Sequence, residues 1–151
     1  MPSKKQKTRL AGNQARQTGR IGAVATKSTE QQSTDYLSPS FRFTHADQNK
    51  YCLNEWTPQE LDSPVSTWQK MERMTWAQIR TSGGHHGSGG GIGWTPIDRS
   101  SLPALPDSVP EDVEIHEVRV TQRMRLFGYR GGTDAIFYVV WFDREHKVCP
   151  V

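Results

Sequence analysis

The stretch RMRLFGYRGGTDAIFYVVWFDREHK, residues 123–147, decides the fold. Its first part, residues 123–130, alternates between two sets of side chains as a strand does, and GGTD at 131–134 follows. Residues 135–142 are then continuously apolar. A glycine turn between two strand patterns predicts a β-hairpin. The apolar run predicts that the second strand of this hairpin is central and covered on both faces.

Strand patterns also occur on either side of the hairpin. The alternation in VEIHEVRV, residues 113–120, changes face midway, so we expect a β-bulge near His116–Glu117. FRFTH at 41–45 predicts a short strand with one apolar face. HKVCPV at 146–151 predicts a short edge strand that stops at Pro150.

Two short helices are expected between the first strand and the others. Ser63 is a suitable cap with Pro64 in the first turn of one helix, and a shorter helical turn is expected at 58–61. Thr75 and Gln78 form a capping box for the other. The fold class predicted is therefore α+β: a small antiparallel sheet with two short helices packed on one face. The other face is expected to carry the arginines.

Composition divides the chain into a tail and one domain. Residues 1–38 are rich in Lys, Gln, Thr, Ser and Gly and have no helical periodicity, so they are predicted to be a disordered basic tail. Residues 39–151 are predicted to form a single α+β domain. Within it, 82–93 is a glycine-rich loop and 94–112 a proline-rich extended connector.

The charge of the chain is unevenly distributed. Residues 1–29 carry seven Lys or Arg side chains and no acid, which gives +7, and because the whole chain carries +3 the remainder carries −4. A basic segment on a mildly acidic body suggests a polyanion partner, because each cation near a phosphate releases counterions. A solvated tail without a specific partner is the alternative that stays open.

Other classes of protein are disfavoured by the composition. Two cysteines, Cys52 and Cys149, are too few for a disulfide framework. No apolar run approaches the ~18 residues that cross a bilayer, and IGAVA at 21–25 is too short for a signal-peptide core. We therefore expect a cytoplasmic protein with no membrane partner.

An arginine row is the main candidate for chemistry. Arg119, Arg123 and Arg125 lie on neighbouring predicted strands, and Arg125 shares a face with Phe127 and Tyr129. Guanidinium groups bind phosphates and aromatic rings stack on unpaired bases, so such a face suits RNA. An ordinary charged, solvated strand face is the alternative.

Cleavage of RNA by its own 2′-OH needs a base, an acid and cations for the developing charge. His146 or His116 has a suitable pKa near neutrality, and Arg119 and Arg125 are placed to stabilise the phosphorane. No metal is needed for this chemistry.

The same residues carry a family resemblance. Glu117-Val118-Arg119, the arginine-rich strand from Arg123 to Tyr129, and the later pair His146 and Lys147 resemble the C-terminal half of RelE/HigB-type toxins. These toxins are small bacterial ribonucleases that cut mRNA, often on the ribosome. The resemblance implies a RelE-like fold, RNA or the ribosome as partner, and an antitoxin protein that covers the basic face. The segment FYVVWFDREHKV at 137–148 also resembles uncharacterised small bacterial and phage-borne proteins.

A metal site is not predicted. The adjacent His85 and His86 lie in the glycine-rich loop, and no pair of His or Cys residues has a recognised zinc spacing. A lid or linker is the expected role of this loop.

The sequence thus predicts an RNA-binding protein, with toxin-type endoribonuclease activity as the sharper hypothesis and no cofactor. The alternatives are a non-catalytic nucleic-acid or protein interaction module, and a phage or mobile-element accessory protein. The expected catalytic residues are Arg119, Arg125 and His146. The expected RNA-binding residues are Arg123, Tyr129, Arg130, Lys147, Lys4, Lys5, Lys7 and Arg9.

Overall fold

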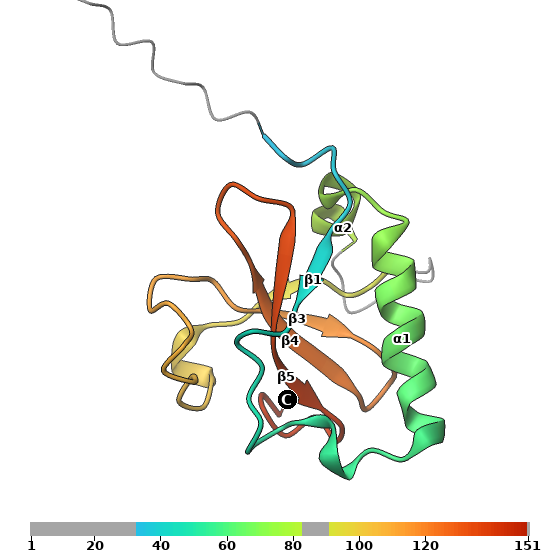
Figure 1. The fold of residues 1–151 in the computed structure, drawn as a ribbon, viewed down its shortest axis with the longest axis vertical. Coiled ribbons are helices and arrows are strands. Elements are labelled where there is room, and N and C mark those ends of the chain that lie inside the picture. The colour runs from blue at the N-terminus through green and yellow to red at the C-terminus, as the bar shows by residue number, and fades with distance from the viewer. Residues whose placement is uncertain (1–32, 83–90, 151) are drawn as a thin grey trace, which may run out of the picture. The chain divides into compact units, whose positions relative to one another are not determined.

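A computed structural model describes residues 33–82 and 91–150 of the chain. These residues build a five-stranded sheet in the order β1-β5-β4-β3-β2 (Figure 1). The strands are β1 (Ser40–Arg42), β2 (Thr95–Pro96), β3 (His116–Arg119), β4 (Arg125–Arg130) and β5 (Ile136–Asp143). The helices are α1 (Pro58–Glu72) and α2 (Trp76–Thr81), with short 3₁₀ turns at Leu53–Glu55 and Arg99–Ser101.

The α+β class is confirmed, but the sheet is mixed rather than antiparallel. β1 pairs with β5 in parallel, whereas β5, β4, β3 and β2 pair antiparallel with one another. Along the chain, both helices and the strands β2, β3 and β4 lie between β1 and β5, yet these two strands are neighbours in the sheet. No turn joins them directly, so their pairing is not restricted to the antiparallel direction of a hairpin. Nothing local in FRFTH specifies which strand it will join.

The β4–β5 hairpin is confirmed, and it contains a bulge that was not predicted. The register shifts between Phe127 and Gly128, whose partners are Trp141 and Val139, so Val140 is the extra residue in β5. Val140 and Trp141 consequently pack on the same face of the sheet. β3 pairs regularly with β4, so the bulge expected near His116–Glu117 is not there.

Helix α1 begins earlier than predicted. Its N-cap is Thr57, whose hydroxyl accepts from the N–H of Glu60 while the Glu60 carboxylate accepts from the N–H of Thr57. Pro64 lies inside this helix and is buried. A proline at this position removes one intrahelical hydrogen bond. The capping box at Thr57 and the packing of α1 against the sheet stabilise the helix on both sides of Pro64. The capping box of Thr75 and Gln78 at the start of α2 is confirmed.

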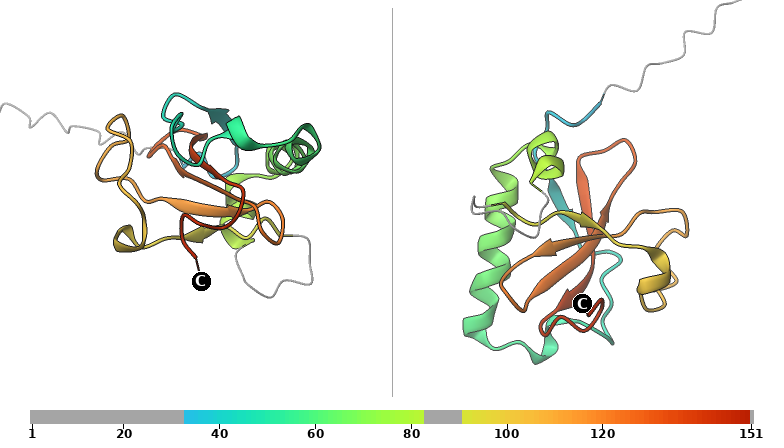
Figure 2. Two further views of the ribbon diagram at one scale, coloured as in Figure 1. Left: turned by 90° about the horizontal axis from the view of Figure 1, so that it is seen from below. Right: turned by 180° about the vertical axis from the view of Figure 1, so that it is seen from behind.

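The helices cover one face of the sheet, as predicted. The buried apolar residues between the helices and this face of the sheet form what we call the helix-side cluster: Trp56, Met71, Trp76, Ile79, Ile92, Trp94, Val118, Leu126, Phe137, Val139 and Phe142. Figures 1 and 2 show α1 running along this side of the sheet.

The opposite face is also apolar, and this corrects the expectation that it carries the arginines. Its residues form the connector-side cluster: Val109, Ile115, Phe127, Tyr129, Val140, Trp141 and Val148. Side chains of the proline-rich connector, among them Ile97, Leu102 and Leu105, pack against it. Figure 2 shows this connector on the side of the sheet opposite α1. Strands covered on both faces read as apolar runs, which confirms the prediction made for residues 135–142.

The folded unit extends further toward the N-terminus than the boundary predicted at residue 39. Arg130 donates to Asp35 at 2.6 Å and to the Thr34 hydroxyl at 2.6 Å, and Leu37 accepts from the N–H of Trp76. Residues 33–38, which were predicted to be the end of a tail at 1–38, are therefore part of the folded unit, and residues 1–32 lie outside the described residues. At the other end, residues 146–150 form bends rather than the predicted edge strand, and Val148 packs into the connector-side cluster.

Candidate functional site

Arg125, one of the three expected catalytic residues, is buried within the protein. It is 6% exposed, and its Nε donates to Glu117 Oε1 at 2.9 Å. Its Nη1 donates to the carbonyl oxygens of Thr121 at 2.7 Å and Met124 at 3.0 Å. The guanidinium is thus occupied by internal acceptors. The prediction that Arg125 acts on a phosphate stays a prediction, and its burial and internal hydrogen bonds count against it.

His146 lies beside the same buried carboxylate. Its Nε2 is 3.6 Å from Glu117 Oε2, and its backbone has a φ of 59°. The turn that places it is held by Asp143, which is 1% exposed and whose carboxylate accepts from the N–H groups of Lys147 at 2.9 Å and Val148 at 2.7 Å. The structure therefore brings His146 and Arg125 together as predicted, but around a neutralising carboxylate rather than an open phosphate site.

Arg119 is opposite Arg125 in the β3–β4 register, yet its surroundings are different. Its Nε is buried and has no hydrogen-bond partner among the described residues. The side chain lines an open cleft of about 410 Å³ beside α1, together with Ser63, Ser66 and Lys70. The three expected catalytic residues thus divide into a buried pair around Glu117 and a separate arginine in a cleft.

The expected RNA-binding residues of the folded body also divide. Arg123 and Lys147 have exposed side chains, and both lie near Glu145, Arg123 at 4.0 Å. Tyr129 is only 4% exposed and stacks on Tyr138 with ring centroids 5.0 Å apart. Burial raises the pKa of the Tyr129 hydroxyl. The expectation that Tyr129 stacks on a base stays a prediction, and the position of its ring in the connector-side cluster counts against it.

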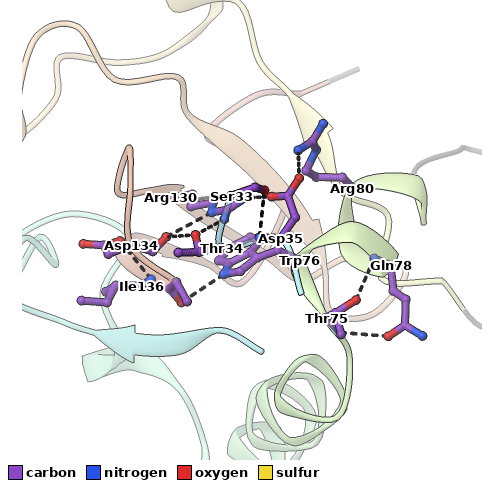
Figure 3. Close-up of polar contacts among 11 residues, drawn as sticks. Ser33, Thr34, Asp35, Thr75, Trp76, Gln78, Arg80, Arg130, Asp134 and Ile136 are labelled. Carbon is purple, nitrogen blue, oxygen red and sulfur yellow. Dashed lines mark hydrogen bonds and ion pairs between the residues drawn. The ribbon is translucent and has the colours of Figure 1, made fainter. Parts of the chain in front are cut away.

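Arg130 takes part in a polar cluster that the sequence did not predict. Its Nη1 lies 2.6 Å from Asp35 Oδ1, Arg80 Nη1 lies 2.5 Å from Asp35 Oδ2, and the Arg130 guanidinium carbon lies 4.7 Å from the centre of a Trp76 ring (Figure 3). The hydrogen bond from Arg130 is the main cause that lowers the pKa of Asp35. This cluster fixes residues 33–38 on the β4–β5 hairpin. No sequence signal placed Asp35 near either arginine.

The remaining candidates lie beyond the described residues. These are Lys4, Lys5, Lys7 and Arg9, together with His85 and His86. Within residues 33–82 and 91–150, no group of three or more His, Cys, Asp or Glu side chains is arranged to hold a metal ion. In the same ranges, none of the helices has the length and apolar character that crossing a membrane requires.

Comparisons with protein-family models, curated proteins and solved structures found no match for this chain. The resemblance to RelE/HigB-type toxins stays a prediction.

Proposed function

We propose that this protein binds RNA through the cations of residues 1–29 and does not cut it. The observation that carries the proposal is the distribution of charge: seven Lys or Arg residues and no acid in that segment, against −4 in the rest of the chain. Such a segment binds phosphates mainly through counterion release, which requires no folded pocket.

The geometry of the folded body supports binding rather than cleavage. A cleaving site needs its cations free to meet the developing charge on the phosphorus. Arg125 is hydrogen-bonded to Glu117 and to two carbonyl groups, and the His146 imidazole faces the same carboxylate. Among the expected catalytic residues, this leaves Arg119 alone beside an open cleft.

The choice of RNA over DNA follows from the resemblance to RelE/HigB-type toxins. That resemblance also suggests the ribosome as the place where RNA is met and an antitoxin as a protein partner. Both remain predictions of the sequence.

The test is the salt dependence of binding to a single-stranded RNA, measured by fluorescence anisotropy. A variant with Lys4, Lys5, Lys7 and Arg9 changed to Gln should bind more weakly. The slope of log K against log salt should fall by about 3, since each lost phosphate contact contributes about 0.7.

The matched control changes four exposed cations of the folded body, Arg42, Lys50, Arg73 and Arg99, to Gln. This control should keep most of the slope. Equal slopes for the wild type and the N-terminal variant would overturn the proposal. The proposal would also be overturned if the wild-type protein cut the RNA and an Arg119→Ala variant did not.

A further inference from the structure

We propose that the cleft between α1 and the end of β3 binds a phosphate group, with Arg119 as its main ligand. The cleft has a volume of about 410 Å³. Its polar side chains are Asp62, Ser63, Ser66, Thr67, Lys70 and Arg119. This inference concerns the folded body and does not depend on residues 1–29.

Arg119 has a buried hydrogen-bond donor, its Nε–H, that lacks an acceptor among the described residues. A buried donor without a partner is unfavourable, and a bound ion or an ordered water is the kind of partner that accounts for such a group in a native protein. In the part of the chain that the structure describes, Arg119 also forms no ion pair, whereas Arg125, Arg130 and Arg144 each have a carboxylate partner. Because the Nε atom has almost no accessible surface, an anion in the cleft would meet the terminal nitrogens of the Arg119 guanidinium group, which lines the cleft without a carboxylate partner.

The other side chains of the cleft suit a phosphate. A guanidinium presents a planar fork of donors to two phosphate oxygens, and a lysine adds a point charge. Ser63 and Ser66 line the same cleft from successive turns of α1, where their hydroxyls are three residues apart and share a face. Asp62 leaves the cleft with a charge of +1 rather than +2. That balance favours a singly charged phosphate, such as a phosphodiester or a protonated monoester, over a dianion.

The backbone around Gly93 fixes the position of Arg119. Ile92 accepts a hydrogen bond from the N–H of Arg119 at 2.9 Å. Gly93 has a φ of 63°, and a Cβ placed on it would come within 3.0 Å of the Arg119 Cβ. The arginine stem therefore packs directly on a glycine that adopts a conformation disfavoured for other residues. This packing leaves the guanidinium little freedom to leave the cleft.

The test follows the Nε–H resonances of the arginines in ¹H–¹⁵N spectra of the full chain. Inorganic phosphate is titrated against sodium chloride at equal ionic strength. Phosphate should shift the Arg119 Nε–H signal in a saturable manner, while the signal of exposed Arg99 should respond to both salts alike. The absence of a saturable, phosphate-specific shift at Arg119 would overturn the proposal.

Two variants and one control examine the site. Arg119→Gln should weaken phosphate binding about tenfold, as expected for loss of a charge-assisted hydrogen bond. Lys70→Gln should weaken it less while preserving the fold, since Lys70 is exposed on α1. Arg99→Gln, at an exposed position outside the cleft, should bind phosphate as the wild type does. Lys70→Gln and Arg99→Gln with the same affinity would contradict the proposed lining.

The source of the phosphate is separated by a second measurement. If RNA supplies it, Arg119→Gln should weaken RNA binding several-fold when residues 1–29 are intact, and the inference then rests on the proposed function. If a small phosphorylated compound supplies it, the same variant should lose phosphate binding and keep its RNA affinity. The N-terminal Gln variant should retain the Arg119 shift, so failure of the RNA proposal and failure of this site are distinguishable.

Discussion

At the scale of single residues, Gly128 is the position where β4 and β5 leave no room for a side chain. A Cβ placed there would lie 2.3 Å from the carbonyl oxygen of Tyr138 and 2.6 Å from Cζ of Phe137. The conflict is partly with the backbone of the neighbouring strand, which cannot rotate away as a side chain can. Gly128 also adjoins the register shift in the β4–β5 pair, so this glycine permits both the close approach and the bulge.

Gly128→Ala should therefore destabilise the protein by about 3 kcal/mol, the upper part of the usual range for overpacking. Gly132, in the loop that joins the same two strands, is the matched control because a Cβ there meets nothing within 4 Å. Gly132→Ala should change the free energy of unfolding by less than about 0.5 kcal/mol. Urea denaturation of both variants checks this, and equal losses would refute the steric argument.

Glu117 and Arg125 form a buried ion pair in which a single carboxylate serves two partners. Glu117 is 7% exposed, its Oε1 accepts from Arg125 and its Oε2 faces His146. Removing one member of such a pair leaves a buried charge without compensation. These side chains therefore stabilise the fold. An Arg125 variant that loses an activity could have lost its fold, so that loss would not by itself identify Arg125 as a catalytic residue.

At the scale of elements, Glu60 joins the start of α1 to the end of β5. One carboxylate oxygen, Oε2, accepts from the N–H of Thr57 at 2.8 Å, and the other, Oε1, accepts from Arg144 Nε at 2.9 Å. The backbone hydrogen bond from Thr57, followed by that from Arg144, lowers the pKa of Glu60 below its ordinary value of 4.5. One side chain thus caps a helix and fixes the turn that follows β5.

This link should be sensitive to acid. Because the pKa of Glu60 is lower in the folded state, the folded protein binds fewer protons than the unfolded chain, and stability falls as pH falls. The contribution is complete above pH 4.5, the ordinary value, and disappears as the pH drops through the folded-state pKa.

Glu60→Gln should lower the urea midpoint at about pH 7, and this effect should shrink as the pH falls below 4.5 and through the folded-state pKa of Glu60. Arg144→Gln removes the same ion pair from its other side, so its effect should decline over the same pH range. A Glu60→Gln effect that is constant with pH would contradict the assignment.

At the scale of the whole molecule, the sheet stands between two apolar layers. Leu126, Phe137 and Val139 face the helices, while Phe127, Val140 and Trp141 face the connector. Both layers depend on the same two strands, β4 and β5. The loss of either layer exposes one face of these strands, so we expect the two layers to unfold together.

Hydrogen exchange at two indole groups tests this coupling. Trp76 Nε1–H donates to the carbonyl oxygen of Ala135 at 3.0 Å in the helix-side layer, and Trp141 Nε1–H donates to Asp47 at 3.3 Å in the connector-side layer. Ile79→Ala, in α2, should lower the opening free energy of both indoles by about 3 kcal/mol. Val109→Ala, in the connector, should lower both by a smaller and equal amount. An effect confined to the nearer indole would show that the layers unfold separately.

Local signals made much of the fold predictable. The hairpin was predicted correctly because its glycine turn and apolar run are adjacent in sequence, and the Thr75–Gln78 capping box needs only four residues. The start of α1 was predicted at Ser63-Pro64, which is also a good local start signal. In the structure, the helix begins earlier, at the capping box of Thr57 and Glu60. The parallel pairing of β1 with β5 joins segments about a hundred residues apart, and no local pattern encodes it.

The candidate site was less predictable than the fold. Alternation correctly placed Phe127 and Tyr129 on one face of the sheet, but periodicity cannot say whether a face is covered. The connector covers that face, and Arg125 beside it is enclosed. The clusters of Asp35 with Arg130 and of Lys70 with Arg119 join distant segments, so composition gave no sign of either.

By itself, the sequence determined the α+β class, the β4–β5 hairpin, the α2 cap and the concentration of positive charge in residues 1–29, because each depends on neighbours along the chain. Only the tertiary structure decided which arginines are accessible. It enclosed Arg125 with Glu117 and placed Arg119 beside a cleft, although the two face each other across adjacent strands. The reason is physical: exposure and charge pairing depend on which distant segments cover a strand, and these segments are brought there by the packing of both layers.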